Sequence, residues 1–347
     1  MTDYVPGHGD ESYSVRHYDL SIDYRLDGNR LTGRATITAV ADQFLGTLAL
    51  DLHGLNVSKV TVNGRAPAKF NHRGSRLEVR LVKPLEVGEE FTVVIGYHGH
   101  PVPVPGVYGD AGWEELKDGV IVASQPHGAP SWFPCNDRPS DKAAYLISVN
   151  APSDYRVVAN GTLVSTRRHA STVTWVYEQP EPMAAYLATV QIGRYQVYEL
   201  EAAVPMTVMI PPARVREVER AFGRQPHMLD VFTRLFGDYP YPSYSVVVTD
   251  DELEIPLEAQ GLSIFGSNFL TDSWGAERLI AHELSHQWFG NCLTIADWKD
   301  IWLHEGFACY AEWLWSEHSS RDTADVHART HWDRLDALPQ NLVLGDP

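Results

Sequence analysis

The stretch LIAHELSHQWFGN, residues 279–291, has the spacing of an amphipathic helix but carries three titratable side chains among its apolar ones. These are His282, Glu283 and His286. Such groups are costly to bury unless something satisfies them. Residues four apart lie on one helix face about one turn apart, so the two imidazoles are placed to bind one common partner.

The H-E-x-x-H spacing is typical of zinc sites in which both histidines ligate the metal and the glutamate serves as general base. The alternative is an ordinary pair of core histidines with hydrogen-bond partners. The helical context favours the metal, because Asp272 or Ser273 can cap the start of the helix and Gly290-Asn291 can end it. The sequence therefore predicts a zinc-binding helix with Glu283 as its base.

A third ligand is available in WLHEGFACYAEW, residues 302–313, which has the pattern of a second helix. Glu305 stands in this stretch, and 18 residues separate it from His286, enough for a turn and a return. Two histidines and one glutamate leave a fourth zinc position open, as catalytic sites require. We expect His282, His286 and Glu305 to hold one zinc ion.

The first half of the chain has the period-two alternation of half-buried strands. In HYDLSIDYRL, residues 17–26, every second residue is apolar, and Asn63-Gly64 and Asn160-Gly161 are hairpin-turn signals between similar runs. From about residue 215 to 236 the apolar residues recur at helical spacing instead. The pattern predicts an antiparallel β domain followed by a domain that contains helices.

Composition limits the partners of the chain. Its 28 basic and 45 acidic residues give a formal charge of −17, so neither nucleic acid nor an anionic membrane surface is an expected partner. It has no run of about 20 apolar residues and no recognisable secretory signal at its start. Three cysteines without a framework spacing fit a reducing compartment, so we expect a cytoplasmic location.

Several residues near the motifs have a purely structural interpretation. Cys292 and Cys309 are expected to be small core residues, because two histidines and a glutamate already suffice as ligands. Tyr310 and the tryptophans of the second helix are expected to serve packing; the tryptophans are Trp302, Trp313 and Trp315.

HELSHQWFGN and WLHEGFA, joined at this spacing, resemble the gluzincin zinc aminopeptidases of the aminopeptidase N and leukotriene hydrolase type. HYDLSIDY, WFPCNDRPSDKAAY, YLATVQIGRY and EAQGLSIF are similar to further stretches of that family, in the same order. The resemblance implies an α+β protein. Residues 1–192 would form the N-terminal antiparallel β domain, and residues 193–347 a thermolysin-like catalytic domain truncated at its C-terminus.

The resemblance also implies an activity, the removal of amino acids from peptides with a free N-terminus. Glu258 in PLEAQGL and Gln125 in ASQPHG are similar to the family residues that bind the substrate amine. A carboxylate facing an ammonium group makes a charge-assisted contact, which favours cleavage at a chain end. Glu312, seven residues after Glu305 and two turns along the same face, is the candidate to orient an imidazole.

The chain departs from the family in its substrate loop. Where the family has G-x-M-E-N, residues 255–259 are Ile-Pro-Leu-Glu-Ala, so the glycine and the asparagine are both absent. Ile-Pro is stiff and extended, which puts the placement of the substrate backbone in question. His304 stands where the family usually has asparagine.

No residue of this sequence is expected to take the role of the family's oxyanion-binding tyrosine, because NLVLGDP, residues 341–347, resembles the stretch before that tyrosine. The family's C-terminal helical region is expected to be missing as well. Three hypotheses stay open: a zinc aminopeptidase, a related zinc hydrolase such as an endopeptidase or epoxide hydrolase, and a catalytically incomplete zinc-binding fragment.

Overall fold

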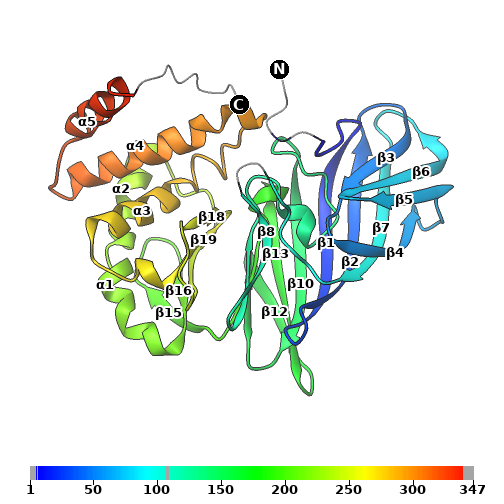
Figure 1. Ribbon diagram of the computed structural model, residues 1–347, viewed down its shortest axis with the longest axis horizontal. Helices are drawn as coiled ribbons and strands as arrows, with labels where there is room; N and C mark the ends of the chain where they lie inside the picture. The colour runs from blue at the N-terminus through cyan, green and yellow to red at the C-terminus, as the bar shows by residue number, and fades with distance from the viewer. Residues whose placement is uncertain (1–4, 6, 107–108, 339–347) are drawn as a thin grey trace. The chain divides into compact units, whose positions relative to one another are not determined.

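The computed structural model describes residues 5, 7–106 and 109–338, and it divides into two units, residues 5–195 and 196–338 (Figure 1). The boundary that the sequence predicts falls after residue 192. The final stretch NLVLGDP lies outside the described residues. Each unit is considered by itself.

The described part of the N-terminal unit forms three sheets (Figure 1). The strands of the largest are β1 (Tyr13–Arg25), β2 (Arg30–Ala41), β4 (Leu55–Val62), β7 (Glu90–Gly99), β10 (Lys142–Pro152), β12 (Thr162–Arg168) and β13 (Thr172–Ala184), in the order β12-β13-β10-β1-β2-β7-β4. The second consists of β8 (Gly112–Leu116), β9 (Gly119–Ala123), β11 (Arg156–Ala159) and β14 (Val190–Gly193). The third consists of β3 (Leu45–Asp51), β5 (Lys69–Arg73) and β6 (Arg76–Leu85). Two 3₁₀ turns, η1 (Ala129–Ser131) and η2 (Ala185–Leu187), complete the unit.

The alternation in the sequence correctly indicates which strand faces are buried. In β1, Leu20 and Ile22 are buried while Ser21 and Asp23 between and after them are exposed. The prediction of a wholly antiparallel domain is wrong at one ladder, since β1 pairs with β10 in parallel. More than a hundred residues separate these two strands, so no tight turn imposes an antiparallel pairing on them.

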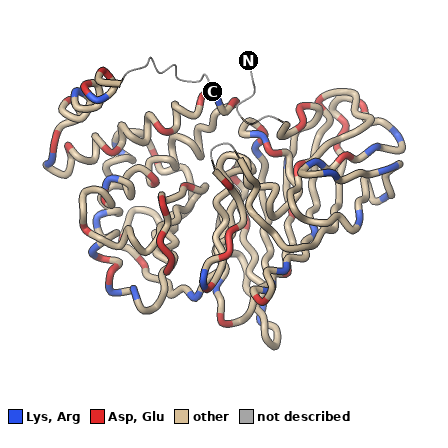
Figure 2. The backbone as a smooth tube through the Cα atoms, viewed as in Figure 1, with Lys and Arg blue, Asp and Glu red and all other residues tan. Residues whose placement is uncertain are grey.

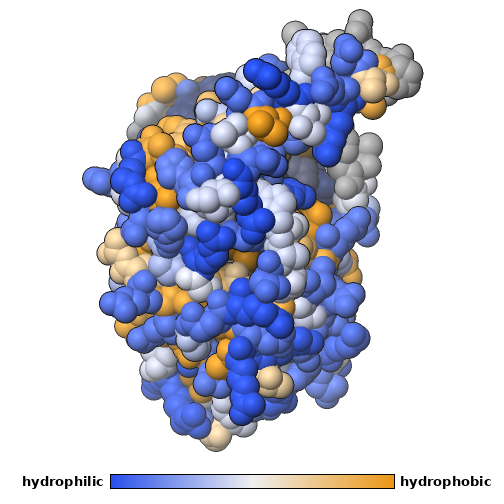
Figure 3. All heavy atoms as spheres, turned by 90° about the vertical axis from the view of Figure 1, so that its left-hand side faces the viewer, coloured by the Kyte–Doolittle hydropathy of each residue, from blue (hydrophilic) through white to orange (hydrophobic). Residues whose placement is uncertain are grey.

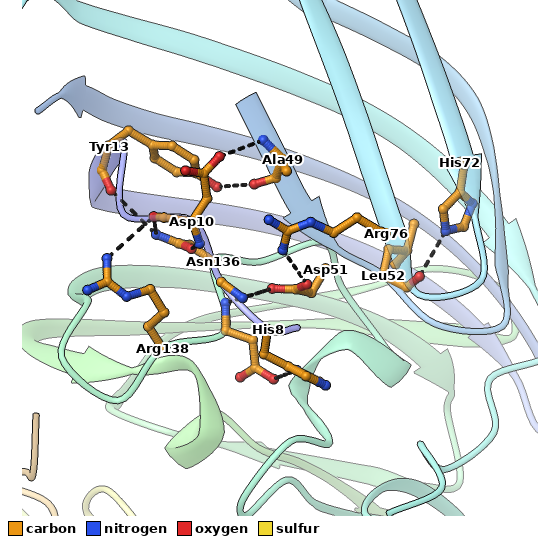
Figure 4. A network of polar contacts seen from close by, with 12 residues as sticks. His8, Asp10, Tyr13, Ala49, Asp51, Leu52, His72, Arg76, Asn136 and Arg138 are labelled. Carbon is orange, nitrogen blue, oxygen red and sulfur yellow. Dashed lines mark hydrogen bonds and ion pairs between the residues drawn. The ribbon is translucent and has the colours of Figure 1, made fainter. Parts of the chain in front are cut away.

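A network of polar contacts holds the loop that follows Cys135 (Figure 4). The carboxylate of Asp51 accepts hydrogen bonds from the Arg76 guanidinium at 2.8 Å and from the Asp137 N–H at 3.2 Å. His8 Nδ1 lies 2.8 Å from the Asp137 carboxylate. Because these buried carboxylates each have partners, they can be accommodated beneath the surface of the unit.

Asp141, in the same loop, makes the stability of the unit depend on pH. Burial raises the pKa of its carboxyl to about 6, although hydrogen bonds from Asn136 and the Val15 N–H oppose the shift. The folded chain therefore binds this proton more tightly than the unfolded chain. The stability from this group is fully present below the unfolded pKa of 3.8 and is lost as the pH rises through 6.

We expect Asp141→Asn to remove this decline. Between about pH 4 and pH 7 the free energy of unfolding of the wild type should fall by on the order of 2 kcal/mol more than that of the variant. Urea unfolding at the two pH values measures the difference. Asp27→Asn, which changes an exposed carboxylate of the same unit, should leave the pH slope of the wild type unchanged. Equal slopes for the wild type and Asp141→Asn would contradict the expectation.

The second unit, over residues 196–338, combines one mixed sheet with helices (Figure 1). Its strands are β15 (Gln196–Leu200), β16 (Met206–Ile210), β17 (Tyr244–Val248), β18 (Leu257–Ala259) and β19 (Leu262–Phe265), in the order β15-β16-β17-β19-β18. Its α-helices are α1 (Val218–Phe222), α2 (Gln225–Phe236), α3 (Trp274–Ser285), α4 (Trp302–His318) and α5 (Ala324–Asp336). The 3₁₀ helices are η3 (Pro212–Glu217), η4 (Ser267–Phe269) and η5 (Trp298–Asp300).

The helical periodicity of residues 215–236 does not produce one helix. The structure has η3, then α1, then α2, with a break at Gly223 and Arg224. Pro226 stands in the first turn of α2. Proline lacks an N–H and its ring clashes with a carbonyl one turn earlier, so it suits the start of a new helix rather than the interior of a continuing one.

The zinc-motif helix α3 begins as the sequence predicts, because the Ser273 side chain accepts a hydrogen bond from the Ala276 N–H. It ends earlier than predicted, at Ser285, and His286 is its C-cap residue. Beyond this point the spacing of the backbone bonds is irregular: the Gln287 N–H bonds to the Leu284 carbonyl three residues back, whereas the Asn291 N–H bonds to the His286 carbonyl five residues back. His286 therefore stands at the end of the helix, still in the helical conformation.

Apolar side chains of the sheet and of the first four helices form one continuous core in the second unit. Phe232 of α2 and Trp315 of α4 are fully buried in it, as is Ile280 of α3. The face shown in Figure 3 is mostly hydrophilic with scattered apolar side chains, and acidic and basic positions are interspersed in both units (Figure 2). No described helix has both the length and the apolar composition that crossing a bilayer requires.

Candidate metal centre

The structure brings the three predicted zinc ligands together from two helices. His282 lies in the last turn of α3, His286 directly after it, and Glu305 in the first turn of α4. One ligand atom from each lies within 4.8 Å of the other two. The Glu305 carboxylate is 3.3 Å from His282 Nε2 and 3.9 Å from His286 Nε2. The three side chains thus converge on one point.

The neighbouring histidines keep the Glu305 carboxyl ionised. Burial acts to raise the pKa of Glu305, but the hydrogen bond with His282 and the charge of His286 outweigh it and lower the pKa to about 2. Glu305 is therefore an ionised carboxylate near neutral pH, which is the form that ligates a metal.

Each imidazole is oriented through its other nitrogen. His282 Nδ1 lies 2.8 Å from the carboxylate of Glu312, whose second oxygen accepts a hydrogen bond of 3.0 Å from Arg278. His286 Nδ1 lies 3.0 Å from the Phe289 carbonyl oxygen. A neutral imidazole has one donor and one acceptor nitrogen, so donation from Nδ1 leaves each Nε2 as a ligand. Sequence reasoning identified Glu312, but it missed Arg278 and the carbonyl.

Glu283 lies beside the ligand cluster, with a carboxylate oxygen within 4.8 Å of a ring nitrogen of His286. It is buried, with 4% of its surface exposed, and its Oε2 atom has no hydrogen-bond partner among the described residues. Burial raises the pKa of its carboxyl well above the ordinary value, and the Glu258 carboxylate adds to that effect against the opposing charge of His282. A raised pKa matches a glutamate to proton transfer near neutral pH.

Glu258 projects toward the same cluster from β18. A carboxylate oxygen of Glu258, one of Glu283 and a ring nitrogen of His286 all lie within 4.8 Å of one another. β18 is the edge strand of its sheet, where Glu258 pairs with Ser263 of β19. The absence of the family's glycine and asparagine therefore does not remove this carboxylate from the site.

The edge strand is fixed to the zinc-motif segment by amide side chains that the sequence analysis did not single out. Gln287 Oε1 accepts a hydrogen bond from the Gly261 N–H at 2.8 Å, and Gln287 Nε2 donates to the Ala259 carbonyl at 3.2 Å. Asn291 Nδ2 donates to the same carbonyl at 3.1 Å. These bonds set the position of Glu258 relative to the histidines.

Gln125 and His304, which the sequence analysis also singled out, are not members of the cluster of metal ligands. Gln125 belongs to the N-terminal unit, so its part in binding a substrate amine stays a prediction. The ring of His304 is buried beside the zinc-motif segment, and its Nε2 accepts a hydrogen bond from the Ile295 N–H at 3.0 Å. His304 thus braces the loop between α3 and α4.

The expectation that both nearby cysteines are core residues, and that Trp302, Tyr310, Trp313 and Trp315 serve packing, is wrong in part. Cys292 is exposed, because it follows the end of α3 in the loop, and Cys309 is half-buried. Trp315 is fully buried, whereas Trp302 and Tyr310 are exposed at 46% and 44%. Helical spacing in so apolar a stretch does not distinguish the buried face from the outer one.

Two stretches of the chain match the domains of one known protein family. Residues 14–187 match the Peptidase M1 N-terminal domain, and residues 220–341 match the Peptidase family M1 domain. Together these matches cover most of the chain, so the chain belongs to peptidase family M1.

Individual relatives are longer proteins. Human endoplasmic reticulum aminopeptidase 1 is 26% identical over 324 residues, which cover 86% of this chain and 34% of that protein. Human glutamyl aminopeptidase is 27% identical over 341 residues, with coverages of 88% and 35%. The chain thus spans about a third of the length of these curated relatives. The crystal structure of an M1 zinc metallopeptidase from Deinococcus radiodurans matches with a TM-score of 0.87 and 30% identity, covering 97% of this chain and 78% of that one.

Membership of the family implies one catalytic zinc ion, and the residues present fit it. The converging donors are two imidazole nitrogens and one carboxylate oxygen, the set that catalytic zinc sites of this kind use. A carboxylate oxygen of the buried Glu283 lies close to His286, and its Oε2 atom has no hydrogen-bond partner among the described residues, so it is free to bond a water molecule or substrate. His282, His286 and Glu305 are the residues that would hold the ion.

We expect Glu312→Ala to weaken zinc binding by roughly 10- to 100-fold, because the His282 ring loses the partner that fixes its tautomer and orientation. Competition with a chelator of known affinity measures the change. Glu317→Ala removes an exposed carboxylate from the same helix and should leave zinc affinity as in the wild type. Equal zinc affinity in both variants would show that the Glu312 contact does not support the metal.

Proposed function

We propose that this chain carries the metal centre and the substrate-amine site of an aminopeptidase that removes N-terminal residues from peptides. The observation that carries the proposal is the placement of Glu258. An acidic side chain on a sheet edge, within 4.8 Å of the base Glu283 and of His286, suits a substrate whose cationic end lies next to the bond that is cut. The relatives named as aminopeptidases support the same activity.

The chemistry divides among the residues of the site. A bound zinc ion supplies Lewis-acid polarisation of the scissile carbonyl and acidifies a water molecule. Glu283 accepts a proton from the attacking water at its free Oε2 atom and then delivers it to the nitrogen of the leaving amine as the C–N bond breaks. Glu312 holds the His282 ring in the tautomer that keeps Nε2 available.

Glu258 explains why cleavage would occur at the end of a peptide. A carboxylate facing a primary ammonium group makes a charge-assisted hydrogen bond, which is roughly twice as strong as a neutral one. An internal peptide segment offers no such cation and would leave the half-buried carboxylate unpaired. The Gln287 and Asn291 bonds keep the strand that carries Glu258 from shifting away.

The alternatives predict different outcomes with the same reagents. An endopeptidase would cut N-acetylated peptides, and an epoxide hydrolase would open an epoxide without needing an amine. A folded, zinc-loaded chain that cleaves none of these substrates would be the catalytically incomplete fragment.

We expect Glu283→Gln to lower kcat by about 10² to 10⁴-fold in hydrolysis of aminoacyl amides, because the amide cannot accept the proton of the attacking water. Zinc content should stay at the wild-type level, since Glu283 is not a ligand. Fluorogenic aminoacyl amides measure the rate, and the N-acetylated form of the same substrate should not be cleaved. Cleavage of the acetylated form at a similar rate would contradict aminopeptidase action.

We expect Glu258→Gln to lower kcat/KM by about 10- to 100-fold, because one charge-assisted contact to the substrate ammonium is lost. The comparison substrate is the same amide without its α-amino group, on which the wild type and Glu258→Gln should act equally slowly. Glu254→Gln changes an exposed acid of the same loop and serves as the control. A loss that is as large on the deamino substrate would assign Glu258 a structural role instead.

A further inference from the structure

Cys309 lies on α4 one helical turn after the zinc ligand Glu305. Its Sγ atom, a ring nitrogen of His282 and a carboxylate oxygen of Glu312 all lie within 4.8 Å of one another. The cluster is thus a second set of three potential metal ligands beside the catalytic one. Cys309 is half-buried, so an ion can reach it from solvent.

The two ligand sets differ in chemical softness. The catalytic set offers two nitrogens and one oxygen, whereas the second set offers a nitrogen, a sulfur and an oxygen. Thiolate is a soft ligand and selects thiophilic ions. Arg278 bonds the Glu312 Oε2 atom at 3.0 Å, so Oε1, the atom nearer His282, remains available to an ion.

His282 belongs to both sets, and this makes them mutually exclusive. In the catalytic set its Nε2 points toward Glu305 while its Nδ1 donates to Glu312. A neutral imidazole presents a lone pair at only one of its nitrogens. An ion bound between Cys309 and Glu312 would take that lone pair at Nδ1 and displace the proton that now bridges to Glu312.

We propose that His282, Cys309 and Glu312 form an alternative site for a soft divalent cation, which competes with the catalytic zinc by taking His282 from it. Binding forms a metal–thiolate bond and releases the thiol proton to solvent, while the imidazole proton of His282 moves from Nδ1 to Nε2. A thiophilic ion such as cadmium would therefore inhibit the enzyme through this site. The inhibition rests on the proposed peptidase function, whereas the binding of the cation does not depend on it.

The test titrates the metal-free full-length chain with cadmium and follows the ultraviolet thiolate-to-cadmium charge-transfer absorption. We expect one saturable equivalent in the wild type and loss of the band in Cys309→Ser. Cys292→Ser, which removes the exposed cysteine near the end of α3, is the matched control and should keep the band. Zinc content and circular dichroism of Cys309→Ser establish that the variant is folded and that its catalytic ligands are intact.

The outcomes separate this proposal from the peptidase function. A band that survives in Cys309→Ser, disappears in Cys292→Ser or is absent from the wild type would overturn the second site. A band that depends on Cys309 supports it, even if the zinc-loaded wild type hydrolyses no aminoacyl amide. Where hydrolysis is present, cadmium should inhibit the wild type and Cys292→Ser more strongly than Cys309→Ser.

Discussion

The end of α3 has to accommodate His282, Glu283 and His286 at once, and surrounding residues of the second unit supply partners to the two histidines. The Glu312 carboxylate accepts a hydrogen bond from His282 Nδ1, and the Phe289 carbonyl accepts one from His286 Nδ1. With those atoms engaged as donors, the Nε2 atom of each neutral imidazole is left to ligate a metal beside Glu305. A metal ion then satisfies both imidazoles and the Glu305 carboxylate, which would otherwise be costly to bury.

The same helix end also controls where a substrate would lie. Gln287 follows His286 directly, and its side chain bonds the backbone on both sides of the turn between β18 and β19. The metal ligands and the edge strand with Glu258 are therefore parts of one rigid frame. Sites held by such supporting bonds keep the geometry that catalysis requires. Gln287 and Asn291 restrain this strand through their side-chain bonds, and Pro256 restricts the backbone just before it.

Sequence reasoning succeeded where local spacing carries the information. The i, i+4 histidines, the Ser273 cap and the alternation in β1 each follow from the geometry of one element. It failed where distant parts of the chain decide the outcome. The parallel pairing of β1 with β10, the exposure of Trp302 and the proximity of Cys309 to His282 depend on tertiary packing, which spacing does not encode. Pro226 was the missed local signal for the break before α2.

The central claim is that two histidines and Glu305 bind one zinc ion on this frame, and anomalous diffraction at the zinc absorption edge tests it most directly. Crystals of the zinc-loaded chain should show one anomalous peak about 2.0 to 2.2 Å from His282 Nε2, His286 Nε2 and a Glu305 oxygen. A peak at other residues, or none at this cluster in zinc-saturated crystals, would contradict the account.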